Sequence, residues 1–212
     1  ALEEDIKKTG YVVLASELKH AKKVNGHFEL ILNSSDKIQC KFLINASGLH
    51  TEDVANRIEE INLPKIKTVM YAKGHYYLYK KKNPFKHLIY PLPNSNGHGI
   101  HAGMDIENNL RFGPNAKWVD SIEYSFDENT LDEFCNSIKS YWINFDPSCL
   151  SPDYTGIRSK IVAEGEGSQD FEILDASDHG LENLIHLQGI DSPGLTSSLS
   201  IAAEVISKLG IY

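Results

Sequence analysis

The stretch Gly189-Ile190-Asp191-Ser192-Pro193-Gly194-Leu195-Thr196, followed by the segment 197–206, decides the fold of this chain. It predicts the end of a strand, a glycine-rich turn and a helix that begins near Pro193, with Ser192 as its N-cap. Gly210 ends the predicted helix. The helix is indicated by apolar residues at helical spacing, namely Leu195, Leu199, Ala202, Ala203 and Ile206.

A glycine turn that opens onto a helix is a candidate ligand site. The free N–H groups and the positive end of the helix dipole attract an anionic or carbonyl-rich ligand. Gly189 and Gly194 would let such a ligand approach the backbone closely. Many helices begin in this way without a ligand, so the turn alone leaves both interpretations open.

Composition restricts the class of protein. A chain of 212 residues can form one large domain or two small ones. Its net charge of −8 argues against nucleic acid as a partner. No run of apolar residues reaches the ~18 to 20 that a membrane span needs, which leaves only peripheral membrane contact open. The three cysteines form no C-x-x-C pair, which favours reduced thiols and a cytoplasmic location.

The N-terminus, Ala1-Leu2-Glu3-Glu4-Asp5, is acidic and has no initiating Met. It is not a signal peptide, and it is typical of the middle of a helix. We therefore expect that the chain begins inside a larger protein.

The order of the predicted elements indicates two domains. Residues 1–62 and 184–212 are expected to form the remainder of a nucleotide-binding layer, and residues 63–183 a second domain. The fold class is α/β (α+β): a partial Rossmann-like layer plus a mixed, largely antiparallel sheet, with a ligand site at the domain interface. Helices are predicted at 1–9, 51–61 (capped by Thr51) and 129–143. Strands are predicted at 11–19, 26–33, 37–45, 67–79, 87–92, 99–104, 109–112, 153–162, 171–174 and 183–188.

Two side chains in the second domain could carry chemistry. His98 and His101 form an H-x-x-H on a predicted strand, where they point to opposite faces, so a shared metal is not expected. His101 is then a candidate for a pocket-facing histidine. Arg158 stands alone in the glycine-bearing segment 154–158. It could bridge a surface carboxylate, or its fork could grip a substrate carboxylate, and both interpretations stay open.

Other candidate motifs give weaker support for a functional site. Asp175, Asp178 and His179 resemble a loose metal cluster, but their polar surroundings favour a solvated turn. Ser192 lacks the Gly-x-Ser-x-Gly context of a nucleophile. Walker, H-E-x-x-H and EF-hand motifs are absent from the sequence, and no metal is expected.

Three blocks of sequence together carry a family resemblance. They are Leu-Ile-Asn-Ala-Ser-Gly-Leu at 43–49, Tyr-Thr-Gly-Ile-Arg at 154–158 and Gly-Ile-Asp-Ser-Pro-Gly-Leu-Thr at 189–196. The chain resembles the FAD-dependent oxidoreductases of the D-amino-acid oxidase type, in particular the L-2-hydroxyglutarate dehydrogenase/oxidase branch. Further blocks fit that branch in the same order, at 73–77, 89–93, 99–101 and 111–116.

The resemblance implies FAD as cofactor and a small 2-hydroxy acid as substrate. The cofactor-binding positions that it implies are Leu18 at the adenine, Gly48 near the phosphate and ribityl region, and the turn with Gly189, Gly194, Leu195 and Thr196 at the flavin edge. Arg158 would bind the substrate carboxylate. His101 would take the proton from the C2 hydroxyl while hydride goes to the flavin. The family carries proline after this arginine, whereas this chain has Ser159.

One departure from the family concerns the cofactor. The G-x-G-x-x-G turn that holds the FAD pyrophosphate is absent, and so is the acidic residue that holds the ribose. We therefore expect a fragment that lacks an N-terminal half, and that is inactive and binds FAD poorly alone. Three hypotheses stay open: an L-2-hydroxy acid oxidoreductase, with oxygen or a quinone as acceptor; an amine or glycerol-3-phosphate oxidising relative; and a non-catalytic truncated remnant.

Overall fold

The computed structural model describes residues 1–92, 99–167 and 170–211, so the predicted histidine at 98 lies outside the described residues. The chain divides into two compact units, Ala1–Thr68 with Asp170–Tyr212, and Val69–Gln169. The sequence placed the boundaries at 62/63 and 183/184. Residues 170–183 fall in the first unit because the strand Glu172–Leu174 pairs with the strand Leu184–Gln188.

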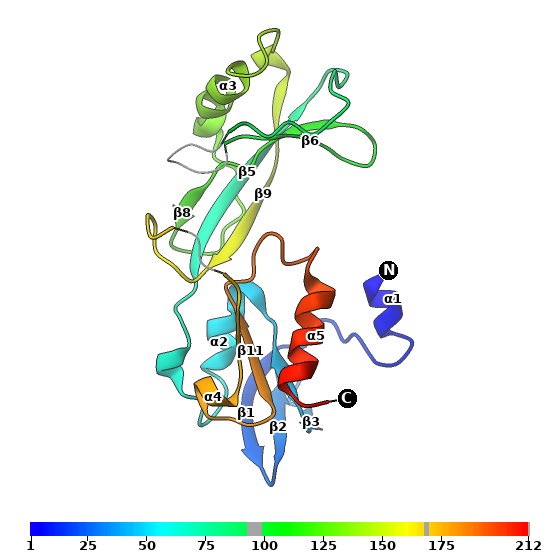
Figure 1. Cartoon of the computed structure of the whole chain (residues 1–212), viewed down its shortest axis with the longest axis vertical. Helices are drawn as coiled ribbons and strands as arrows, with labels where there is room; N and C mark the ends of the chain where they lie inside the picture. The colour runs from blue at the N-terminus through cyan, green and yellow to red at the C-terminus, as the bar shows by residue number, and fades with distance from the viewer. Residues whose placement is uncertain (93–98, 168–169, 212) are drawn as a thin grey trace. The chain divides into compact units, whose positions relative to one another are not determined.

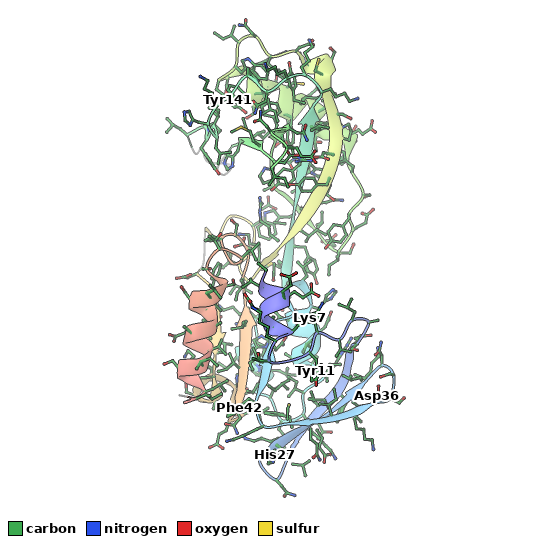
Figure 2. The ribbon with its side chains drawn as sticks, turned by 90° about the vertical axis from the view of Figure 1, so that its right-hand side faces the viewer. Lys7, Tyr11, His27, Asp36, Phe42 and Tyr141 are labelled. Carbon is green, nitrogen blue, oxygen red and sulfur yellow. The ribbon has the colours of Figure 1, made fainter. Side chains whose placement is uncertain are left out.

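The first unit contains two small sheets. One is an antiparallel meander of β1 (Leu18–Val24), β2 (His27–Leu32) and β3 (Lys37–Cys40), and Figure 2 marks its two turns by His27 and Asp36. In the other, β11 (Leu184–Gln188) lies between β10 (Glu172–Leu174), which is antiparallel to it, and β4 (Leu43–Asn45), which is parallel. All five residues of β11 are buried, which confirms the predicted strand at 183–188.

In the part of the first unit that the structure describes, four α-helices accompany these sheets. They are α1 (Leu2–Ile6), α2 (Thr51–Ala55), α4 (Ala176–His179) and α5 (Ser198–Lys208), the last lying beside β11 in Figure 1. One core cluster joins the meander to the segment after α2 and to the start of β11, through Ala21, Phe28, Ala55, Ile58, Leu181 and Leu184. A second cluster joins β11 to α5 through Ile185, Leu187 and Val205. Among the described residues, no helix is long and apolar enough to cross a membrane.

Two predicted strands of the first unit are wrong in part. The predicted strand 11–19 is a strand only from Leu18, and Tyr11 and Leu14 are 94% and 83% exposed. An apolar run forms a strand only where another strand pairs with it. The predicted strand 37–45 is interrupted at Lys41–Phe42, because β3 pairs with β2 whereas β4 pairs with β11.

Both predicted N-caps are also wrong. His50 occupies the N-cap of α2, and the Thr51 hydroxyl donates instead to the carbonyl of Leu187 on β11, at 2.7 Å. The last helix begins at Ser198 rather than at Pro193, because the preceding residues form tight turns. The two helices deviate in opposite directions: α2 starts one residue earlier than a cap at Thr51 would allow, and α5 starts later than a cap at Ser192 would suggest.

The described residues of the second unit form one five-stranded sheet with an α-helix on one face. The strand β5 (Met70–Tyr79) pairs with β9 (Leu150–Lys160) along its whole length, as Figure 1 shows, and also with β7 (Leu110–Phe112) and β8 (Lys117–Val119). Beyond β7 lies β6 (Ala102–Met104). Every pairing among the described residues of this sheet is antiparallel, which confirms the largely antiparallel character that the sequence predicted.

The amphipathic helix α3 (Leu131–Lys139) packs on one face of this sheet. The core between them contains Tyr77, Tyr79, Ala102, Phe112, Phe134 and Ile138. Side chains alternate along a strand, so Ala72, Gly74 and Tyr76 of β5 lie on the face opposite to Tyr77. That opposite face carries the candidate substrate residues.

Candidate functional site

A groove of ≈ 540 Å³ in the first unit brings together three of the predicted cofactor residues, Gly48, Gly189 and Gly194. Its walls come from the ends of β4 and β11 and from one side of α5. The lining is mostly apolar, with Ile44, Leu187, Ile190, Ile201, Val205 and Ile206. Gln188 and Ser198 also line it, and none of the described lining residues carries a charge.

Glycine is required at these turns for two reasons. Gly48 and Gly189 have φ angles of +58° and +69°, in the left-handed region that favours glycine. A Cβ on Gly194 would lie 2.5 Å from Cγ2 of Ile190 and 2.6 Å from the carbonyl oxygen of Asp191, so the turn closes only without a side chain. These three positions therefore line the groove with backbone and no side chain.

The other three predicted cofactor residues do not line this groove. Leu195 is 83% exposed and Thr196 is also exposed. Leu18 begins β1, and its carbonyl accepts a hydrogen bond from Arg57 at 2.6 Å. Their contacts with a cofactor stay predictions.

A buried polar network next to the groove fixes the strand ends and was not found from the sequence. Nδ2 of Asn45 donates to the carbonyl of Thr51 at 2.8 Å and lies 3.0 Å from Nδ1 of His186. Oδ1 of Asn45 accepts from the Ser47 hydroxyl at 2.6 Å. Burial lowers the pKa of His186 to about 4, so this imidazole is neutral near pH 7. The signal in the sequence was only an Asn at the end of an apolar strand.

Arg158, on β9 in the second unit, differs from the other arginines. The sequence contains three arginines, and Arg57 and Arg111 both form ion pairs with carboxylates. Among the described residues, the half-buried guanidinium of Arg158 forms no hydrogen bond or ion pair. The first interpretation of Arg158, that it bridges a surface carboxylate, therefore has no support among the described residues.

The surroundings of Arg158 on its face of the sheet are two glycines and two tyrosines. Gly74 and Gly156 are paired in register, and a Cβ on Gly74 would lie 3.7 Å from Nη2 of Arg158. The next pair, Tyr76 and Tyr154, stacks with ring centroids 4.4 Å apart and an interplanar angle of 14°. Burial raises the pKa of both phenols, so both are protonated near pH 7. A cation, a glycine floor and two hydroxyl-bearing rings thus share one face.

His101 comes directly before β6 and is half-buried. The register aligns Ala102 with Phe112 and Tyr77, on the face that α3 covers, so alternation places His101 on the opposite face, with Tyr76. Its ring centroid lies 4.2 Å from that of Tyr90. The structure therefore brings the two predicted catalytic residues onto one face of one sheet, and their roles stay predictions.

The α3-facing side of β5 holds a polar clasp that sequence reasoning missed. Oδ1 of Asn115 accepts from the backbone N–H of His75 at 2.9 Å and from its Nδ1 at 3.0 Å. Nδ2 of Asn115 donates to Glu133 of α3 at 2.9 Å. Burial lowers the pKa of His75, which keeps the ring neutral. The clasp fixes the backbone that carries Gly74 and Tyr76.

The suspected cluster at 175–179 is a helix cap. Asp175 and Asp178 form the capping box of α4, and Asp175 pairs with Lys208 at 2.7 Å. Among the residues that the structure describes, no group of three or more His, Cys, Asp or Glu side chains could hold a metal ion.

The sequence matches the FAD dependent oxidoreductase (DAO) family over residues 1–208, and the chain therefore belongs to this family. It is 31% identical over 178 residues to the mitochondrial L-2-hydroxyglutarate dehydrogenase of Arabidopsis thaliana, across 78% of this chain and 37% of the relative. It is 27% identical to a glycerol 3-phosphate dehydrogenase of Caloramator mitchellensis, across 99% of this chain and 42% of the relative. The chain thus spans less than half the length of these relatives.

Solved structures show the same fold. The FAD-bound L-alpha-glycerophosphate oxidase of Mycoplasma pneumoniae superposes with a TM-score of 0.77 at 18% identity, over 92% of this chain and 50% of that chain. A glycine oxidase of Geobacillus kaustophilus gives a TM-score of 0.70 at 13% identity, over 94% of this chain and 50% of the other. The predicted fold class and family resemblance are confirmed.

Proposed function

We propose that this chain is part of an FAD-dependent enzyme that oxidises the CH–OH group of an L-2-hydroxy acid, such as 2-hydroxyglutarate, to the 2-keto acid. The observation that carries the proposal is the guanidinium of Arg158, which lies above Gly74 and has no carboxylate partner among the described residues. A half-buried cation without a carboxylate partner is suited to a ligand that brings one. The 31% identity to an L-2-hydroxyglutarate dehydrogenase supports the choice of substrate.

The groove of the first unit fits the ring portion of FAD. Its glycines let a flat ligand approach the backbone, and its volume lies in the range of small-molecule sites. In the proposed enzyme Gly48, Gly189 and Gly194 contact the cofactor through the backbone. When bound, FAD supplies the acceptor for the hydride.

The residues of the second unit bind the substrate and move its proton. The Arg158 fork receives the carboxylate in two parallel hydrogen bonds. The neutral hydroxyls of Tyr76 and Tyr154 are available to donate to substrate oxygens. His101 accepts the proton of the C2 hydroxyl as the C–H bond breaks.

The proposal includes an N-terminal half as a partner. The described lining of the groove has no charged residue, and a pyrophosphate needs N–H groups or cations to hold it. We expect this chain alone to bind FAD more weakly than micromolar in a calorimetric titration, and to stay colourless after removal of excess FAD. A sub-micromolar dissociation constant, with a yellow protein, would show that the chain needs no partner to hold the cofactor.

The second candidate is oxidation of glycerol 3-phosphate, which is favoured by the relatives and the solved structure that carry that name. A phosphate dianion would need more positive charge than the one guanidinium of Arg158 supplies. Substrate profiling of the enzyme that contains this chain separates the two. Reduction of bound flavin by L-2-hydroxyglutarate and not by glycerol 3-phosphate is the expected result, and the reverse preference would replace the proposal.

A further inference from the structure

Gly156 lies in the middle of β9, where glycine normally weakens a strand. A glycine in a strand interior costs about 0.5–1 kcal/mol relative to alanine and often marks a place where a ligand or another backbone approaches closely. Its φ is not in the left-handed region, and a Cβ built on it would meet no atom within 4 Å. Neither the backbone conformation nor packing against the described residues requires glycine here.

Gly74, its partner in register on β5, shows the contrasting case. A Cβ there would lie 2.8 Å from Cβ of Pro114 and 3.1 Å from the carbonyl oxygen of Asn115. Packing of the segment after β7 therefore demands glycine at 74. Gly74 and Gly156 are paired on neighbouring strands, yet only at Gly74 does packing exclude a side chain. At Gly156 the space that a side chain would occupy is open.

The open space at Gly156 has a defined chemical boundary. Arg158 and Tyr154 are two residues away on either side, so all three side-chain positions share one face of β9. The guanidinium lies over Gly74, beside the opening, and the stacked Tyr76–Tyr154 pair closes the other end. Positions two residues apart on a strand are about 6.6 Å apart, which is room for a carboxylate and one or two carbons.

We propose that Gly156 determines substrate specificity: its missing side chain lets the carboxylate end of an unbranched 2-hydroxy acid lie against the β9 backbone, within reach of Arg158. The inference rests on the proposed function and adds to it the residue that admits the substrate. A methyl group at 156 takes part of that space and an isopropyl group takes most of it. The effect on binding therefore grows with the size of the residue at 156, while folding is unaffected or improved.

The test uses the FAD-loaded enzyme that contains this chain. It measures how far L-2-hydroxyglutarate protects the Arg158 guanidinium from phenylglyoxal, by mass spectrometry of the peptide that contains Arg158. The variants are Gly156→Ala and Gly156→Val. The matched control is Gly103→Ala on β6, where a Cβ would meet only the carbonyl oxygen of Arg111 at an ordinary 3.9 Å. Thermal melts of all four proteins are recorded beside the protection curves.

We expect protection in the unchanged chain and in Gly103→Ala at the same ligand concentration. Gly156→Ala should need about tenfold more ligand, because inserting a methylene-sized group into a filled site costs on the order of 1–3 kcal/mol. Gly156→Val should show no protection at concentrations that saturate the unchanged chain. Equal protection in Gly156→Val and the unchanged chain would overturn the specificity role and leave the proposed function standing. Absence of protection in the unchanged chain would overturn both.

Discussion

The sheet β10–β11–β4 of the first unit and the sheet around β5 and β9 of the second present two different kinds of candidate surface. The first offers backbone and apolar side chains, with glycines at Gly48, Gly189 and Gly194 and no charge among the described lining residues. The second offers side chains on one face: two protonated phenols, an imidazole, and a guanidinium that has no ion-pair partner in the described part of the chain. A flat, largely uncharged ring suits the first surface, and a small anion suits the second.

The prediction with the largest expected effect tests whether the two units have separate cores. Phe134→Ala removes a side chain with 0% exposure from the core of the second unit, and should lower its free energy of unfolding by about 3–5 kcal/mol. Trp118 and Trp142, the two tryptophans of the chain, both lie in this unit, so their fluorescence reports its denaturation. Phe28→Ala is the matched change in the first unit. If Phe28→Ala shifts the tryptophan transition as much as Phe134→Ala does, the two cores do not unfold independently.

The next effect tests the charge on the second surface. Arg158→Ala should cost on the order of 2–4 kcal/mol of substrate binding, measured as a raised KM in the FAD-loaded enzyme that contains this chain. Arg158→Lys should recover only part of the loss, because an ammonium keeps the charge and loses the fork. An unchanged KM in Arg158→Ala would remove this residue from the substrate site.

The third prediction concerns pH and the first unit. His186 stays neutral in the folded chain down to its pKa of about 4, whereas an unfolded histidine takes up a proton near its ordinary pKa of about 6.5. Between these values the unfolded state binds more protons, so the free energy of unfolding should fall by up to about 3 kcal/mol as pH drops from about 6.5 to about 4.

The check is to measure the unfolding of the first unit across this pH window, with hydrogen exchange of the β11 amides as the probe. His186→Gln should flatten the pH dependence, although burial also lowers the pKa of His179 in the same unit and leaves part of the slope. The same slope in the variant and the unchanged chain would show that His186 is not the group that titrates.

The smallest effect concerns the clasp beneath the second surface. Asn115→Ala removes the acceptor of the His75 ring and leaves a buried N–H without a partner, which should cost about 1–3 kcal/mol in the tryptophan-detected unfolding of the second unit. Glu133→Gln keeps an oxygen that can accept from Asn115 and should cost less. Equal losses in both variants would mean that the link to Glu133, and not the buried histidine, supplies the stability.

Local patterns predicted some of these features and missed others for identifiable reasons. The apolar run at 183–188 is a buried strand, because such a run excludes water wherever it lies in a core. The cap at Ser192 was wrong because the residues after it form turns before α5 begins. The cap at Thr51 was wrong because a hydroxyl binds whichever acceptor the fold brings near it. For Thr51 this is the carbonyl of Leu187, which is far away in sequence.

The apolar segment 11–14 also shows that a local pattern does not determine structure without its partner. Its composition is typical of a strand, yet Tyr11, which Figure 2 labels, is 94% exposed. Strand formation depends on a neighbour with free N–H and C=O groups, and no residue of the segment itself encodes that neighbour.

The sequence by itself determined the strand, glycine turn and helix order around 189–206, the antiparallel character of the second unit, and the alternation that puts Tyr154, Gly156 and Arg158 on one face. These follow from periods of two and of 3.6 residues, which are local. Only the tertiary structure decided that Gly74 faces Gly156, that Arg158 has no carboxylate partner among the described residues, and that three distant glycines line one groove. Strand register and ion pairing join residues far apart in the chain, so they depend on the packing of the whole unit.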